Sequence, residues 1–230
     1  MRGNLYVVSV PIGNLEDITL RALRILKEVD LIAAEDTRHT RKLLSHYDIH
    51  TPMISYFEHN ETQKDKTLIE KLKIGYNIAL VSDSGTPAIS DPGYTIINAC
   101  IAEGIDIVPI PGPSSILSAL VVSGFPLHNF VFEGFPSPKH SGRMKKFRSL
   151  IDEKRTIIFF ESTHRLLKSL EDMLEVFGDR QIVIANDITK YFEEFYRGSI
   201  SSAIEKYTEI KPKGEFTIVV RGKTEDENEK

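Results

Sequence analysis

This chain has almost no cysteine, and therefore almost no thiol groups. Its 230 residues include one cysteine, Cys100, and no tryptophan. Cys100 lies among isoleucines, where a small buried thiol is expected rather than a nucleophile or a metal ligand. A lone cysteine also excludes a disulfide within the chain and is typical of proteins from a reducing compartment. The sequence therefore predicts a cytoplasmic protein held together by an ordinary hydrophobic core.

Long apolar runs and excess positive charge are missing as well. No stretch is long enough to cross a bilayer, and the N-terminal apolar run is too short for a signal peptide. Lysine and arginine number 29 against 33 acidic residues, a net charge of -4, so no global basic field would hold a polyanion. Contact with nucleic acid must therefore be local. The 41% hydrophobic and 27% charged content is typical of a soluble globular protein with one or two domains.

The common cofactor and metal motifs are absent too. The chain has no GxGxxG after a strand, no GxxxxGK[ST], no HExxH and no paired CxxC, which disfavours the usual dinucleotide, triphosphate and zinc sites. Its seven histidines show no ligand spacing. The sequence therefore predicts no metal site.

The most informative stretch that is present covers residues 78–93, IALVSDSGTPAISDPG. Residues 78–81 have the length and composition of a strand buried on both faces. The chain then turns to hydroxyls, a carboxylate, a glycine and a proline, which suit a ligand cradle at the carboxyl end of a strand. An ordinary strand-to-helix connection is shorter than this. The stretch is therefore interpreted as a ligand loop rather than a plain turn.

The first half of the chain alternates strand and helix patterns. Strands are expected at residues 5–10, 31–34, 53–57, 78–81 and 105–110, and helices at 41–47, 61–74 and 94–102. A further helix, capped by Asp17, is expected to end at Val29. This alternation predicts a mostly parallel sheet with helices on both faces. The strand ends near Pro11, Asp36, Asp83 and Pro111 should then lie at one edge.

A second α/β domain is expected after a linker at residues 124–127. Its strands are predicted at 130–132, 156–160, 181–184, 194–197 and 216–221, and its helices at 144–151, 166–177 and 201–209. Two consecutive strands around a turn at 191–194 favour a mixed sheet. The predicted domains are therefore 1–123 and 124–230, the second ending in a frayed acidic tail at 224–230.

Eight strings in order along the chain resemble one family closely. They are SVPIGNLEDIT at 9–19, AAEDTRHTRKLL at 33–44, ALVSDSGTPAISDPGY at 79–94, VPIPGPSS at 108–115, EGFPSPK at 133–139, FFESTHRL at 159–166, ITKYFEE at 188–194 and KGEFTIVV at 213–220. This set resembles the ribosomal RNA small-subunit methyltransferase I family, within the tetrapyrrole methylase superfamily. AEDTRHT, DSGTPAISDPG and ESTHR are specific to it, whereas PGPSS is shared more widely.

The resemblance implies a two-domain tetrapyrrole-methylase-like fold, with S-adenosylmethionine in the cleft between the domains. It also implies 2′-O-methylation of a decoding-centre cytidine in the 16S rRNA of the 30S subunit, by a homodimer. Two departures are Asp187, where the family often has Glu, and the absence of a C-terminal segment found in many members. The implied cofactor contacts are Pro11, Gly13, Asp83, Ser84, Gly85, Thr86, Pro87, Ser114 and Ser115 from the first domain, and Phe160, Asn186, Gly214 and Glu215 from the second.

Methyl transfer to a hydroxyl is an in-line displacement that needs positioning and the removal of one proton, but no metal. A ribose hydroxyl is a weak acid, so a base matters. Asp36 with Arg38 is the preferred pair for handling the substrate, and the alternative is an internal ion pair that only stiffens the loop. The other candidates near the predicted cleft are Glu35, Glu161, His164 and Lys190.

RNA binding requires local cations, and the sequence supplies two clusters. Clusters of this size are usually solvated faces, but beside the predicted cleft they suit phosphate contacts. Two other functions stay open: methylation of a corrin-type small molecule, and a regulatory module that binds S-adenosylmethionine without turnover. The candidate RNA contacts are Arg41 and Lys42 in one cluster, Lys139, Arg143, Lys145, Lys146 and Arg148 in the other, and His164 with Arg165.

Overall fold

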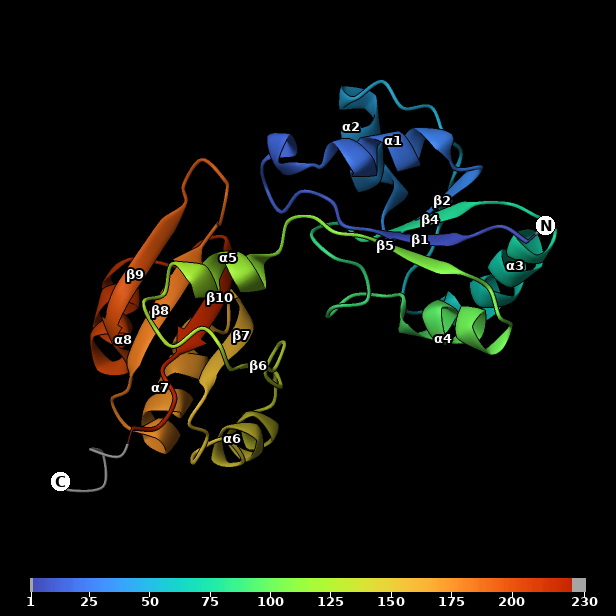
Figure 1. The fold of residues 1–230 in the computed structure, drawn as a ribbon. Coiled ribbons are helices and arrows are strands. Elements are labelled where there is room, and N and C mark those ends of the chain that lie inside the picture. Colours follow the sequence, from blue (N-terminus) through green and yellow to red (C-terminus); the bar gives the residue numbers. More distant parts are fainter. Residues whose placement is uncertain (1, 225–230) are drawn as a thin grey trace. The chain divides into compact units, whose positions relative to one another are not determined.

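The computed structural model describes residues 2–224 and divides the chain into two α/β units, unit 1 (Met1–Ser114) and unit 2 (Ser115–Lys230) (Figure 1). The division falls before the domain boundary predicted after Ser123. The reason is a helix that the sequence pattern does not predict, α5 (Ser115–Val121), which packs against strands of unit 2. Most of the predicted acidic tail, residues 225–230, lies outside the described residues.

Unit 1 is built on a parallel sheet, as the strand and helix alternation predicts. Every neighbouring pair of strands is parallel, and β2 and β4 are buried at all four of their residues. Helices on both faces explain why these two strands are continuous apolar runs rather than alternating ones. The strand order is β3 (Met53–Ser55), β2 (Leu31–Ala34), β4 (Ile78–Val81), β1 (Leu5–Val8) and β5 (Ile107–Ile110).

Two helices cover each face of this sheet (Figure 1). α1 (Leu20–Glu28) and α2 (Thr37–His46) pack on one face, and α3 (Glu61–Lys73) and α4 (Tyr94–Ala102) on the other. Cys100 of α4 is fully buried in the second core, as predicted, and burial raises the pKa of its thiol to about 11.

Side-chain caps shift two helix starts from their predicted places. The Thr19 hydroxyl, not Asp17, caps α1 by accepting a hydrogen bond from the Ala22 N–H at 3.1 Å, and Asp17 lies in a short 3₁₀ turn, η1 (Leu15–Asp17). α2 begins before its predicted start at residue 41, because the Asp36 carboxylate accepts a hydrogen bond from the Arg38 N–H at 2.8 Å.

Unit 2 is a mixed five-stranded sheet, as predicted. Its strands β6 and β7 run parallel, and the other pairs are antiparallel. α6 (His140–Arg148), α7 (Leu166–Phe177) and α8 (Ile200–Glu209) share one core with the sheet. The strand order is β6 (Phe130–Phe132), β7 (Thr156–Ser162), β10 (Glu215–Val220), β8 (Gln181–Asn186) and β9 (Glu194–Ser199).

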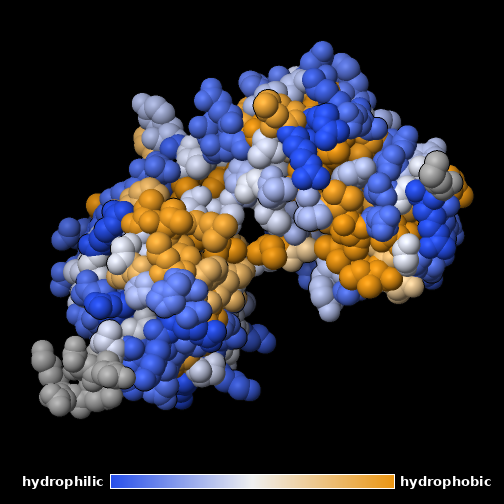
Figure 2. Space-filling model, in the orientation of Figure 1, coloured by the Kyte–Doolittle hydropathy of each residue, from blue (hydrophilic) through white to orange (hydrophobic). Residues whose placement is uncertain are grey.

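Helix α5 packs against β10 and β8 but leaves part of its surface uncovered within unit 2. Leu117 is 53% exposed and Val121 is 63% exposed. Hydrophobic residues gather on this face of unit 2, over α5 (Figure 2). Among the residues that the structure describes, no helix has the length and apolar character needed to span a membrane.

Candidate functional site

Three loops meet at the carboxyl edge of the unit 1 sheet. β1 ends at Val8, two residues before its predicted end. Val10, in the loop that follows, exchanges two backbone hydrogen bonds with Gly85, at 2.9 and 3.2 Å. The Ser9 and Thr86 hydroxyls lie 2.9 Å apart. A Cβ atom on Gly112 would lie 2.9 Å from the Ser9 Cβ, so the third loop passes close to the first. The structure therefore brings together the loops that carry the predicted cofactor residues of unit 1.

Two carboxylates brace the ends of β2 and β4 at this edge. Asp83 Oδ1 accepts a hydrogen bond from the Asp36 N–H at 3.0 Å, and Glu35 Oε2 accepts one from the Asp83 N–H at 3.2 Å. Burial of Glu35, with Asp83 and Asp36 close by, raises the pKa of its carboxyl despite the hydrogen bond that it accepts. A carboxyl of raised pKa is better suited to accept a proton near neutral pH than an ordinary one.

The carboxyl of Asp36, in contrast to that of Glu35, has a lowered pKa. Arg38 donates to it from Nε at 3.2 Å and from a terminal nitrogen at 3.0 Å. Hydrogen bonds from Arg38, first from the side chain and then from the backbone, hold the pKa of Asp36 at about 2. The structure thus contains the internal ion pair considered as the alternative, while the Arg38 side chain stays 87% exposed. Asp36 is a permanent carboxylate and a poor proton acceptor.

The turn between β4 and α4 adds a third half-buried carboxyl, that of Asp91. Ala88 and Ser90 hold left-handed backbone angles, φ 68° and 64°, and the Ala88 N–H bonds to the Pro92 carbonyl at 3.2 Å. Non-glycine residues in this region cost roughly 1 kcal/mol or more each. Burial, then the charges of Glu35 and Asp83, raises the pKa of Asp91 to about 7. The sequence marks residues 91–93 as an acidic turn but gives no signal that Asp91 joins the other two carboxyls.

Hydrogen bonds around the buried Tyr56 hydroxyl and the half-buried Glu61 fix this turn to the helices beside it. The hydroxyl of Tyr56, which is 1% exposed, lies 2.9 Å from Asp65 Oδ1 and 3.1 Å from the Thr95 hydroxyl. Glu61 Oε1 accepts the Gly93 N–H at 2.8 Å, so the first turn of α3 holds the start of α4. Such satisfied buried networks rigidify the segment that they join.

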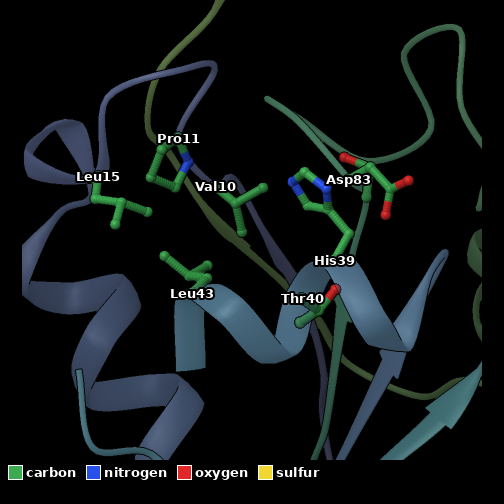
Figure 3. A pocket seen from close by; sticks show the side chains of 8 residues that line it. Val10, Pro11, Leu15, His39, Thr40, Leu43 and Asp83 are labelled. Atoms are coloured by element: carbon green, nitrogen blue, oxygen red, sulfur yellow. The ribbon is translucent and has the colours of Figure 1, made fainter. Parts of the chain in front are cut away.

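A small hollow lies beside these loops in unit 1 (Figure 3). Its volume is about 40 Å³, far below the roughly 300 to 1,000 Å³ of sites that enclose a whole small molecule. Thr40 lines it, is 3% exposed and has a hydroxyl without a hydrogen-bond partner. The lining residues are Val10, Pro11, Leu15, His39, Thr40, Leu43, Ser82 and Asp83.

Two of the candidates in unit 2 are tied to each other. Glu161 is 2% exposed, pairs with Arg165 at 2.9 Å and accepts a hydrogen bond from the Ser169 hydroxyl. Arg165 also lies over the Phe135 ring, 5.9 Å from its centroid. Phe135 in turn contacts the candidate cofactor residue Phe160, with ring centroids 5.4 Å apart. These contacts give Glu161 and Arg165 a positioning role within unit 2 and leave Glu161 poorly placed as a base.

Lys190 is held as a cation. Burial alone would lower the pKa of its amine, but hydrogen bonds to Glu215 at 2.7 Å and Asp187 at 3.1 Å outweigh burial and raise it. Lys190 is therefore unsuited to accept a proton. Beside it, the Asn186 Oδ1 atom is buried without a hydrogen-bond partner. Gly214 has φ +97°, and a Cβ atom there would lie 2.3 Å from an Asp187 oxygen, so a larger residue would be strained and would displace the Asp187 carboxylate.

The basic residues of α6 differ in exposure. Arg143 is 3% exposed and donates to Asp172 at 2.6 Å, so its placement speaks against the predicted RNA contact. Lys146 pairs with Glu133 at 2.6 Å and Arg148 with Glu175 at 3.7 Å. Five of the predicted RNA contacts are exposed and form no ion pair with any described residue: Lys139, Lys145, Arg41, Lys42 and His164. The cation cluster is therefore smaller than the sequence count suggests.

Known proteins resemble this chain over most of its length. The family described as Tetrapyrrole (Corrin/Porphyrin) Methylases matches residues 4–204. Two proteins named Ribosomal RNA small subunit methyltransferase I are 50% identical to it. The match to that of Synechocystis sp. covers 98% of this chain and 81% of that protein, and the match to that of Thermotoga maritima covers 96% and 99%.

Solved structures share the fold at much lower identity. Diphthine synthase is 16% identical with a TM-score of 0.72, covering 96% of this chain and 91% of that one. Uroporphyrin-III C-methyltransferase from Thermus thermophilus, complexed with S-adenyl homocysteine, is 18% identical with a TM-score of 0.66, covering 94% and 97%. Both confirm the predicted two-unit α/β architecture.

Asp91 should make the folded protein less stable as the pH rises. Its folded pKa of about 7 exceeds the ordinary 3.8, so the folded state keeps a proton that the unfolded state releases. This stabilisation is complete below about pH 4 and is lost as the pH rises through about 7. The free energy of unfolding, measured with urea, should fall from about pH 5 to about pH 8 more steeply in the wild type than in Asp91→Asn. Asp106→Asn, at an exposed position, should keep the wild-type slope. Parallel slopes for wild type and Asp91→Asn would contradict the assignment.

Proposed function

Because the chain belongs to the tetrapyrrole methylases and, among them, to the ribosomal RNA small subunit methyltransferase I family, we propose that it methylates the RNA of the small ribosomal subunit with S-adenosylmethionine. The observation that carries this proposal is the 50% identity to relatives of that name over nearly the whole chain. The finer target is the 2′-hydroxyl of a decoding-centre cytidine in 16S rRNA, which the sequence resemblance supports.

The residues present suit S-adenosylmethionine, which when bound supplies a methyl group on a positively charged sulfur. Pro11, the 83–87 loop and Ser114 would contact it from unit 1, where the Ser9 and Thr86 hydroxyls offer polar contacts beside the paired loops. In unit 2 the buried Asn186 Oδ1 lacks a protein donor, and the cofactor carries amine and hydroxyl donors that could satisfy it.

Glu35 is the proposed proton acceptor at this edge of unit 1. Its pKa is raised, whereas Asp36 has a pKa of about 2 and Lys190 is held protonated. In this role the Glu35 carboxylate would take the proton that the ribose hydroxyl loses when it receives the methyl group supplied by S-adenosylmethionine. A positioned base of this kind contributes roughly 10²- to 10⁴-fold.

RNA would be held by local cations, since the net charge of -4 provides no global attraction. Arg38 lies in the first turn of α2, three residues after Glu35, and Arg41 and Lys42 lie further along the same helix. Lys139 and Lys145 are the solvent-facing cations of the second cluster. As the family resemblance also suggests, we place the protein in the cytoplasm as a homodimer, and the exposed Leu117 and Val121 offer an apolar surface for a second copy.

A methyl-transfer assay tests the function directly. The enzyme is given labelled S-adenosylmethionine with 30S subunits, with free 16S rRNA, or with a panel of tetrapyrroles. We expect label in the RNA of the 30S subunit, recovered as 2′-O-methylcytidine after digestion. Label in a tetrapyrrole instead would assign the protein to small-molecule methylation, and binding without transfer would make it a regulatory module.

Asp36 and Arg38 should act on the substrate and not on the cofactor. An exposed arginine held by a carboxylate can bind an RNA phosphate through two donors. Asparagine at position 36 still caps α2 but no longer fixes Arg38. We expect Arg38→Ala and Asp36→Asn to lose ~10²-fold in single-turnover transfer to 30S subunits while affinity for S-adenosylmethionine, measured by calorimetry, is unchanged.

A matched control is Arg24→Ala on α1, because Arg24 forms an exposed ion pair with Glu28 at 2.7 Å. It should transfer methyl groups at the wild-type rate. Wild-type rates in both the Arg38 and the Asp36 variants would mean that their pair only stiffens the loop.

The exposed lysines of the second cluster should contact phosphates. Lys139→Glu with Lys145→Glu should weaken 30S binding and reduce the slope of log affinity against log salt by about one for each lost contact. Binding measured between low and moderate salt checks this, and Lys211→Glu, at another exposed lysine, serves as the control. An unchanged slope would show that the cluster is a solvated face.

A further inference from the structure

The loop between β6 and α6 covers residues 133–139 (Figure 1). Two arginines hold it from the body of unit 2. A terminal nitrogen of Arg143 donates to the Ser137 carbonyl at 3.3 Å, and one of Arg165 donates to the Pro136 carbonyl at 3.4 Å. Two prolines within the loop also restrict its backbone. The loop therefore has a fixed shape.

Each of these arginines is anchored by a buried carboxylate. Arg143 pairs with Asp172 at 2.6 Å, and Arg165 pairs with Glu161 at 2.9 Å. Asp172 is 7% exposed and Glu161 is 2% exposed. Buried ion pairs are weak evidence for stability, because the loss of hydration offsets much of their attraction. Their effect here is to fix the position of the loop that the arginines hold.

The loop carries Phe135, whose side chain is 53% exposed. The centroid of its ring lies 5.4 Å from that of Phe160, which lies 4.9 Å from that of Phe132, and the last two rings are partly exposed. Single exposed apolar residues are common on protein surfaces. A ring that rests on another ring, in a loop held by two buried ion pairs, instead keeps one orientation. The rings of Phe132, Phe135 and Phe160 form an aromatic surface on unit 2.

The charges on the loop and on α6 favour an anionic partner for this aromatic surface. Lys139 and Lys145 are exposed and form no ion pair with any described residue. The nearby carboxylates are already neutralised, since Glu133 pairs with Lys146 at 2.6 Å and the two buried ones pair with the arginines. Aromatic rings beside free cations bind single-stranded nucleic acid, with bases on the rings and phosphates on the cations.

We propose that Phe135 stacks on an unpaired base of the RNA substrate, while Lys139 at the end of the loop contacts an adjoining phosphate. The inference rests on the proposed function and adds the form in which the RNA is bound. The face of a base within a duplex is covered by its neighbours, so this base must be taken out of its stack. Every base has such a face, so Phe135 holds the strand without selecting the base.

Three substitutions separate stacking from simple apolar contact. Phe135→Tyr keeps the ring and should bind 30S subunits with wild-type affinity. Phe135→Leu and Phe135→Ala have no flat ring and should bind about tenfold more weakly. Tyr94→Ala is the matched control, because Tyr94 is another exposed aromatic residue, 73% exposed, on α4 of unit 1. It should bind like the wild type.

The salt dependence distinguishes a lost stack from a disordered loop. Phe135→Leu changes no charge, so its slope of log affinity against log salt should equal that of the wild type, whereas Lys139→Glu should reduce the slope. A loop that had lost its shape would misplace Lys139 and reduce the slope in Phe135→Leu as well. Affinity for S-adenosylmethionine, measured by calorimetry, and stability to urea should be unchanged in Phe135→Leu.

Wild-type 30S affinity or a reduced salt slope in Phe135→Leu would overturn the proposal. Weaker binding of S-adenosylmethionine by that variant would also overturn it, because Phe135 would then contact the cofactor. Each of these results leaves the proposed function standing. If the wild type transfers no methyl group to 30S subunits, the proposed function is wrong and the stacking site falls with it.

Discussion

A pair of backbone hydrogen bonds between Val10 and Gly85 holds the candidate site of unit 1 together. Parallel strands bring their carboxyl ends to one edge, but they do not fix the loops that leave it. The Val10–Gly85 bridge does so, because it joins the loop after β1 to the loop after β4. Gly85 has φ +70°, and a Cβ atom there would lie 3.4 Å from an Ile12 methyl group, so a larger residue would be strained. The Ser9–Thr86 contact lies directly beside this bridge.

Around that bridge, the local environment gives chemically identical carboxyl groups very different pKa values. Asp36 gains hydrogen bonds from Arg38 and its pKa drops to about 2. Asp91 is half-buried near Glu35 and Asp83, and its pKa rises to about 7. Sites that handle protons commonly contain carboxyls whose surroundings push their pKa values apart. The contrast suits Asp36 to holding the charge of Arg38, whereas Glu35, whose pKa is raised by burial, is the proposed proton acceptor.

Much of the fold could be predicted from the sequence, because its signals are local. The bounds of β2, β4, α4 and α7 match the prediction, since apolar runs and helical periodicity end at clear breakers. α5 was missed because it is short and follows a loop rich in proline and serine. Side-chain partners were beyond local signals. Arg143 looks like its basic neighbours in sequence, but its burial depends on Asp172, in another helix. Likewise, the unpaired hydroxyl of Thr40 and the raised pKa of Asp91 arise from contacts between segments far apart in the chain.

Asp36 performs three tasks with one side chain and one N–H group. It caps α2, it holds Arg38, and its backbone N–H ties β2 to Asp83. Substitutions at this position therefore cannot vary one property alone, and their effects will not add to those of changes at residues 38 or 83. A single substitution at position 36 therefore alters the helix start, the position of Arg38 and the backbone contact to Asp83 together, which makes the position pleiotropic in evolution. Asparagine, serine or threonine at position 36 would keep the cap but would lose the negative charge that holds Arg38, so the helix start and the arginine position cannot be optimised independently.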